Sequence, residues 1–207
     1  KEKRLISNPE WARAFFDERI NQDAKWLLKH VPLQIVGSYR YAFLHKSLME
    51  FFAAEHLFDS ALVTSVAMCG HDLNSMSLQE EPEVINFLVD GIKRNPDFAE
   101  VLFEVIASSR HTAENWKAAA NAITILNRAQ INLSNRDFKR VRLGGMESSG
   151  KSWGADLTSA ILTAANFAEA DLRYVTFRQT WLDGVNFKGA CLDNINFGEL
   201  PYLAGNV

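Results

Sequence analysis

Residues 145–152 read GMESSGKS and contain groups that could bind phosphate. The stretch matches the pattern GxxxxGK[ST] in full. In that pattern the glycines expose backbone N–H groups to phosphates, the lysine contacts the outer phosphates and the serine hydroxyl binds magnesium. Taken alone, the motif predicts a nucleotide-binding loop.

The sequence around the motif argues against that interpretation. A phosphate-binding loop needs a strand before it and a helix after it, so that the phosphates lie at a helix N-terminus. Here Gly154, Ala155 and Leu157 follow at once and belong to a repeated apolar pattern, and no parallel βαβ pattern is present. We therefore favour a flexible Gly/Ser loop inserted at about residues 145–153.

No other group of residues has a spacing that suggests chemistry. Cys69 and Cys191 are far apart, and the histidines have no ligand spacing with a partner. Paired carboxylates and nucleophile–base sets are also missing. The sequence predicts no catalytic residue, no metal site and no cofactor. The cysteine usage favours a reducing compartment, which indicates a cytoplasmic protein.

The most regular feature of the chain is a five-residue apolar period. A second apolar or small residue precedes each large one by two positions, as Ala155 precedes Leu157 and Ala170 precedes Leu172. Five is neither a helix nor a strand period, so the pattern predicts stacked units that bury their apolar sides against one another. The large residues are Leu157, Leu162, Phe167, Leu172, Phe177, Leu182, Phe187, Leu192, Phe197 and Tyr202.

Units such as ADLTS at 155–159 and ADLRY at 170–174 resemble the pentapeptide-repeat family. The resemblance implies a right-handed, four-sided (quadrilateral) β-helix with four units per coil. It also implies that the Ala and Leu/Phe positions point inward and the other three positions point outward.

The same period begins earlier, at Leu133, Phe138 and Leu143. The next large apolar residue is expected at position 148, which is a serine, and the five-residue period resumes only at Leu157. About nine residues are therefore inserted between two units, and insertions in stacked repeats normally leave the fold from one face.

The first 130 residues predict helices and one small hairpin. Asn8-Pro9 begins a helix that runs to about residue 29, and residues 33–44 alternate around Gly37-Ser38 as a β-hairpin does. Further helices are expected at 45–58, at 83–94, after Asn95-Pro96 and at 113–128. The predicted fold class is α+β, with a helical bundle at 1–130 followed by the β-helix at 131–204.

Residues 39–54, YRYAFLHKSLMEFFAA, carry a second resemblance. They are similar to the end of the winged-helix region of NACHT-family (STAND) NTPases, whose pattern is F-x-H-x-S-(F/L)-x-E-(F/Y)-(F/L)-A-A. The resemblance implies a fragment of a signalling NACHT–pentapeptide–WD40 protein whose nucleotide-binding domain lies upstream. The family's histidine touches the β-phosphate of ADP, so His45 would be a nucleotide sensor in the parent protein. Alternatively, His45 only begins the helix and covers the hairpin.

Sorting the outward positions by a twenty-residue coil gives one apolar column. Ile161, Trp181 and Pro201 share it, and Leu203 lies beside them, whereas the other columns are polar or mixed. Clustered apolar residues on an outward face usually mark a contact surface. These four residues are therefore expected to bind a partner or another domain. In the alternative, the inserted loop covers the column with Trp153.

These features predict a non-catalytic module for protein interaction, a scaffold and relay within a NACHT-type ATPase. Its partners are other domains of the parent or another protein, self-association is possible, and neither nucleic acid nor membrane is expected. The rival function is that of a pentapeptide-repeat DNA mimic that inhibits a type II topoisomerase. Charges from residue 131 onward are nearly balanced, which disfavours imitation of phosphates.

Overall fold

A computed structural model describes residues 33–35, 41–43, 45–63, 72–75 and 77–198. The chain divides into two compact units, Lys1–Phe52 and Ala53–Val207. The predicted helix at 8–29 lies outside the described residues. The domain boundary expected between residues 130 and 131 stays a prediction.

The first unit contains the hairpin that the sequence predicts. Strands β1 (Leu33–Ile35) and β2 (Tyr41–Phe43) pair antiparallel, with Leu33 opposite Phe43. The aromatic ring of Phe43 stacks on that of Phe52, with centroids 5.9 Å apart. This contact holds the hairpin against the start of helix α3 (Lys46–Val63).

The second unit begins within α3 and continues with helices α5 (Pro82–Arg94), α6 (Asp97–Ser108) and α7 (Trp116–Arg128). Short 3-10 turns, η1 (Leu78–Glu80) and η2 (Ala113–Asn115), precede α5 and α7. Proline at the first position of α5 fits its start, because the missing N–H has no intrahelical partner there. The helices expected after Pro82, Pro96 and Thr112 are confirmed, although residues 113–115 form a 3-10 turn.

Helix α7 is the centre of the helical part. Every residue from Ala118 to Leu126 is buried, and the helix contacts α5, α6 and β3. Its alanines let these neighbours approach closely. The buried side-chain amide of α7, Asn121, accepts a hydrogen bond from the Leu78 backbone N–H (3.0 Å) and donates one to the Leu73 carbonyl (2.8 Å). A buried polar group needs such partners, so Asn121 fixes Leu73 and the start of η1 onto α7.

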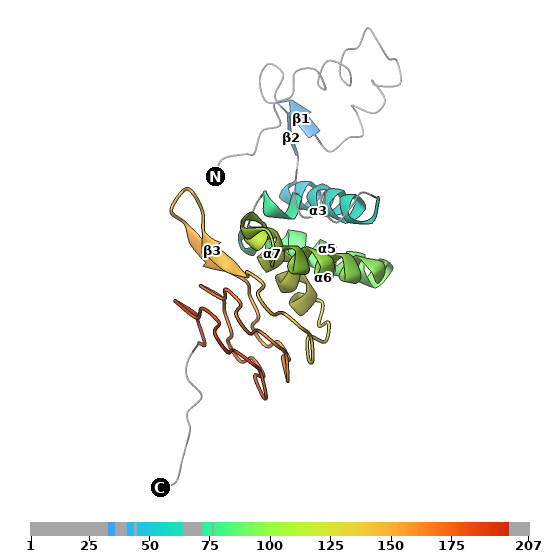
Figure 1. The fold of residues 1–207 in the computed structure, drawn as a ribbon. Coiled ribbons are helices and arrows are strands. Elements are labelled where there is room, and N and C mark those ends of the chain that lie inside the picture. Colours follow the sequence, from blue (N-terminus) through green and yellow to red (C-terminus); the bar gives the residue numbers. More distant parts are fainter. Residues whose placement is uncertain (1–32, 36–40, 44, 64–71, 76, 199–207) are drawn as a thin grey trace. The chain divides into compact units, whose positions relative to one another are not determined.

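Residues 131–198 form what we call the stacked region. Apart from one small hairpin, its pairing consists of isolated parallel bridges, among them Asp156–Thr176, Ile161–Trp181 and Asn166–Asn186. Each of these pairs is twenty residues apart, so the chain returns to the same face after every four units, and we call each return a coil. The bridges fall in the four columns that the sequence predicts. In Figure 1 the orange and red parts of the chain run beside one another in successive turns.

The nine-residue insertion is confirmed by the register of the first coil. Asp137 bridges Asn166 and Arg142 bridges Asp171, at a separation of 29 rather than twenty residues. The difference equals the inserted length. The insertion therefore leaves every later residue on its original face.

The inward positions are those that the period predicts. The large residues from Leu133 to Phe177 and the small ones from Ala155 to Val175 are buried. Phe167 stacks between Phe138 (5.0 Å) and Phe187 (5.9 Å), which are inward residues of the coils on either side. Burial of each such side chain contributes roughly 1.5–3 kcal/mol, so the stack is held by its interior.

A tight turn follows each inward Leu or Phe. The Ala160 N–H donates to the Leu157 carbonyl at 3.0 Å, and Ser159 between them has φ of 61°. Positive φ at the third residue is what a type II turn requires. The same conformation recurs every five residues up to 194, mostly in residues other than glycine, including Ala164 and Tyr174.

Helix α7 covers the first coil, as expected for the exposed end of a stack. The Asp156 N–H donates to Thr124 Oγ1 at 3.0 Å, and Asn127 donates to the carbonyls of Asp156 and Thr158. At the other end of the described stack, Leu192 and Phe197 are 37% and 42% exposed. Inward residues are thus buried only where a helix or another coil lies on both sides.

The inserted segment is an ordered hairpin rather than the flexible loop expected. Strands β3 (Gly144–Met146) and β4 (Ser152–Gly154) pair antiparallel, with Gly144 opposite Gly154. A Cβ on Gly144 would lie 1.7 Å from the Arg173 carbonyl oxygen, so only glycine allows this close approach to the neighbouring coil. The sequence prediction missed the hairpin because its strands are only three residues long.

Truncation of Phe167 tests whether the stacked interior holds the fold. We expect Phe167→Ala to lower the free energy of unfolding by about 3–5 kcal/mol, because the side chain is fully buried between two other rings. Phe197→Ala is the matched control at the same repeat position, and its cost should be less than half as large. Urea unfolding followed by circular dichroism measures both, and equal losses would contradict the inward assignment.

Candidate functional site

Ile161 and Trp181 form the apolar column, a pair of exposed side chains on adjacent coils. A parallel bridge joins the two residues, and the Trp181 N–H donates to the Ala160 carbonyl at 2.9 Å. The backbone ladder therefore fixes the side chains next to each other. Ile161 is 56% exposed and Trp181 is 68% exposed, although both are large and apolar.

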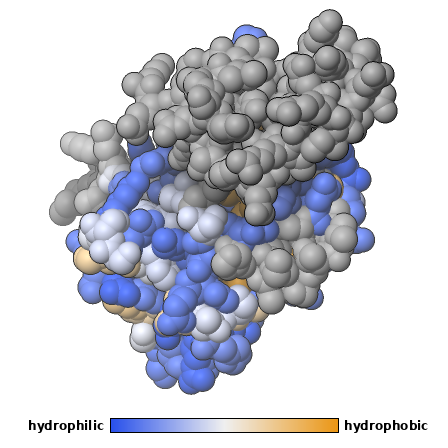
Figure 2. Space-filling view, turned by 90° about the horizontal axis from the view of Figure 1, so that it is seen from above, coloured by the Kyte–Doolittle hydropathy of each residue, from blue (hydrophilic) through white to orange (hydrophobic). Residues whose placement is uncertain are grey.

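The neighbouring columns carry polar side chains that form hydrogen bonds with one another. Asn186 donates to Asn166 Oδ1 at 3.0 Å, and Asn166 donates to Asp137 Oδ1 at 2.8 Å, which makes a ladder of side chains across three coils. On another face, Arg173 binds both carboxylate oxygens of Asp171 at 2.9 and 2.7 Å. Ile161 and Trp181 can form no such ladder, and they differ from the hydrophilic residues that dominate the described surface in Figure 2.

Two of the four predicted contact residues, Pro201 and Leu203, lie outside the described residues. Trp153, the alternative cover for the column, is 6% exposed and its ring lies 4.8 Å from that of Trp116. The alternative in which Trp153 covers Ile161 and Trp181 is therefore wrong.

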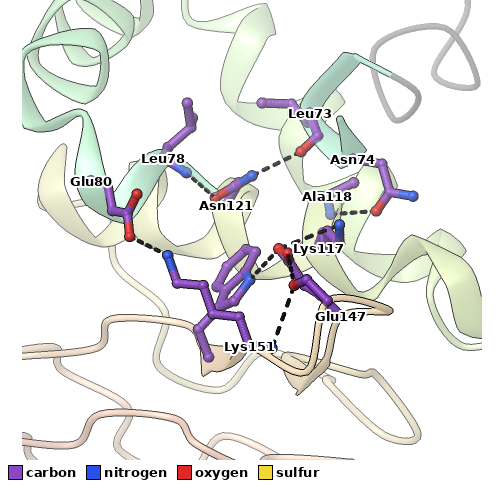
Figure 3. A network of polar contacts seen from close by, with 11 residues as sticks. Leu73, Asn74, Leu78, Glu80, Lys117, Ala118, Asn121, Glu147 and Lys151 are labelled. Atoms are coloured by element: carbon purple, nitrogen blue, oxygen red, sulfur yellow. Dashed lines mark hydrogen bonds and ion pairs between the residues drawn. The ribbon is translucent and has the colours of Figure 1, made fainter. Parts of the chain in front are cut away.

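The phosphate-binding motif lies in the β3–β4 hairpin. An antiparallel strand that begins at Ser152, not a helix, follows the lysine, so the motif does not lead into a helix as a phosphate-binding loop does. The Lys151 ammonium forms an ion pair with Glu80 of η1 (Figure 3). The motif thus lacks the geometry that phosphate binding needs, and its lysine is engaged with a carboxylate.

The hairpin is attached to α7 by one carboxylate and two rings. Glu147 accepts a hydrogen bond from the Trp153 indole N–H at 3.0 Å and lies 3.4 Å from the Lys117 ammonium (Figure 3). The hydrogen bond from Trp153 and the positive charge of Lys117 lower the pKa of Glu147. Gly145 lies directly against the Trp116 indole, so the motif's first glycine serves packing.

Four arginines that the sequence analysis did not single out line one groove. This arginine groove contains Arg110, Arg140, Arg142 and Arg173 and has a volume of about 610 Å³. Residues 142, 171 and 191 share a column, which becomes visible in the sequence once the nine inserted residues are subtracted. Arg110 comes from the segment after α6, and its proximity could not be predicted from the repeat.

His45 precedes helix α3, and its side chain is exposed. Its carbonyl accepts the Leu48 N–H at 3.2 Å, as expected for a residue at the start of a helix. A role in nucleotide sensing stays a prediction. Within the described ranges, no group of three or more His, Cys, Asp or Glu side chains could hold a metal ion. No helix in the same ranges is long and apolar enough to cross a membrane.

Comparison with known proteins supports the repeat. The family model for pentapeptide repeats matches residues 154–189 with eight copies. Neither the comparison with curated proteins nor that with solved structures gives a match. The matched segment contains both Ile161 and Trp181, whereas the resemblance of residues 39–54 to NACHT proteins has no support from these comparisons.

The attachment of the hairpin should weaken in acid. Because folding lowers the pKa of Glu147, its contribution to stability is complete above the ordinary carboxyl value of about 4.3. The contribution is lost as the pH falls through the lower value of the folded protein. Urea unfolding followed by tryptophan fluorescence between pH 6 and pH 3 measures this, and Glu147→Gln should flatten the profile. Identical profiles for the variant and the wild type would contradict this role of Glu147.

Proposed function

We propose that residues 131–198 form a right-handed, four-sided β-helix that serves as a scaffold for protein–protein interaction. The apolar column would be its contact surface, and the partner would present apolar side chains to Ile161 and Trp181. The helical part would cover one end of the β-helix. In this proposal the division at residues 130 and 131 separates the cover from the scaffold.

The exposure of Trp181 is the observation that carries the proposal. A side chain of this size has a large apolar area, and tryptophan is the residue most enriched among those that dominate binding energy at interfaces. The backbone bridge to Ile161 fixes its position before binding, so little conformational freedom is lost when a partner docks. Pro201 and Leu203 would extend the same surface.

A finer version makes this module a relay in a NACHT-type signalling ATPase. It rests on the motif at residues 39–54 and would give His45 contact with the β-phosphate of ADP in the parent protein. For the rival function of a DNA mimic, the described part of the stacked region supplies no continuous acidic face, because Arg140 and Arg173 pair with Glu169 and Asp171.

Photo-crosslinking from the apolar column tests the proposed surface. We expect benzoylphenylalanine placed at position 181 to give a discrete crosslinked product in cells, because Trp181 would lie within the interface. Mass spectrometry of that product identifies the second component, and a second copy of the chain would identify self-association. Ile161→Ser in the same chain should remove most of the product without changing the melting temperature.

Position 186 provides the matched control. Asn186 is exposed on the neighbouring coil face and belongs to the polar ladder. If positions 181 and 186 give the same products, or if neither gives any, the apolar column is not the contact surface.

A further inference from the structure

The arginine groove lies on a different face from the apolar column. Arg142, Asp171 and Cys191 occupy one column across three coils, and Arg110 reaches the groove from the end of α6. Arg140 and Arg173 come from turns of the first and second coils. The groove thus collects four guanidinium groups from separate parts of one compact unit.

Three of the four arginines already have carboxylate partners. Arg140 donates to Glu169 at 2.6 Å, and Arg173 binds Asp171 through two nitrogens. The Arg110 guanidinium lies 3.6 Å from the Asp137 carboxylate and donates a hydrogen bond to the Asp137 backbone carbonyl. The hydrogen bond from Arg140 lowers the pKa of Glu169, and the hydrogen bonds to Asp171 raise that of Arg173.

Arg142 differs from the other three. Its guanidinium has no hydrogen-bond or ion-pair partner among the described residues, although its backbone N–H donates to the buried Ser109 hydroxyl at 3.0 Å. The residue is only partly exposed. Arg110 also keeps one buried N–H, at Nε, without an acceptor. The groove therefore contains more donors than its own acceptors use.

A second hollow adjoins the groove. It has a volume of about 290 Å³ and shares Arg142, Asp171 and Arg173 with the first, and Trp116, Met146 and the acidic Glu114 also line it. Met146 is 59% exposed. A ligand bound to Arg142 could thus place an apolar or aromatic group against Trp116 and Met146.

We propose that the arginine groove binds a phosphate monoester whose organic part is apolar or aromatic. The planar guanidinium matches phosphate oxygens in a bidentate manner, and a phosphate offers several acceptors to Arg142 and to the outer nitrogens of its neighbours. Charges on Glu169, Asp171 and Asp193 limit the affinity, because they also line the groove. The phosphate belongs either to a small molecule or to a modified tyrosine on another protein.

Calorimetric titration of the full chain with phenyl phosphate tests this inference. We expect saturable binding that weakens at least tenfold in Arg142→Gln, a variant that breaks no ion pair among the described residues. Arg178→Gln is the matched control, because Arg178 is an exposed arginine on the face that carries Asp156 and Thr176. The control should bind phenyl phosphate as the wild type does.

A glycine-flanked phosphotyrosine pentapeptide distinguishes the two sources. Binding at least tenfold tighter than that of phenyl phosphate would assign the groove to a phosphorylated protein, and comparable binding would assign it to a small phosphate ester. The inference is overturned if neither probe binds at millimolar concentration, or if Arg142→Gln binds as the wild type does. An equal loss of affinity for phenyl phosphate in Arg178→Gln would also overturn the inference, since binding would then depend on net charge alone.

Discussion

Burial of one leucine or phenylalanine per five residues between successive coils is the constraint on which the stacked region depends. The rings of Phe138, Phe167 and Phe187 stack through three coils, and the small residues beside them let the chain turn at each corner. Parallel bridges keep the backbone in register, so the outward side chains fall into columns. Because the interior and the backbone supply the stability, the outward positions are free to carry other properties. At the end of the stack, helix α7 takes the place of a further coil and covers the first one.

Much of this arrangement could be predicted from the sequence, since it follows from a period. The inward positions, the four columns and the nine-residue shift between the first and second coils all come from counting in fives. Helix boundaries near Pro82 and Pro96 were predictable because proline fits only the first turn of a helix. Other features depend on contacts between distant residues. The positive φ of Ala164 and Tyr174 is imposed by the coil, and the hairpin at 144–154 is ordered by Trp116 and Lys117 of α7.

The candidate sites also divide into one that follows from the repeat period and one that depends on contacts between distant residues. Ile161 and Trp181 were identified from the sequence because the column rule applies to them directly. The arginine groove was missed because Arg110 comes from outside the repeat and Arg142 is displaced by the insertion. The phosphate-binding motif illustrates the opposite error, a full local match without the helix that would give it function. In the fold its lysine pairs with Glu80 and its first glycine packs on Trp116. Local pattern and tertiary context must agree before a motif indicates a site.

Both candidate surfaces depend on the register across the insertion, in which Asp137 lies beside Asn166 rather than on another face. Neighbouring parallel strands are about 4.8 Å apart, which is within reach of a disulfide between paired residues. In a chain with Cys69 and Cys191 replaced by serine, Asp137→Cys combined with Asn166→Cys should form an intramolecular disulfide on mild oxidation. Asp137→Cys combined with Asp171→Cys, one face further along, should stay reduced. Disulfide formation by the second pair instead of the first would contradict the coil register and the surfaces derived from it.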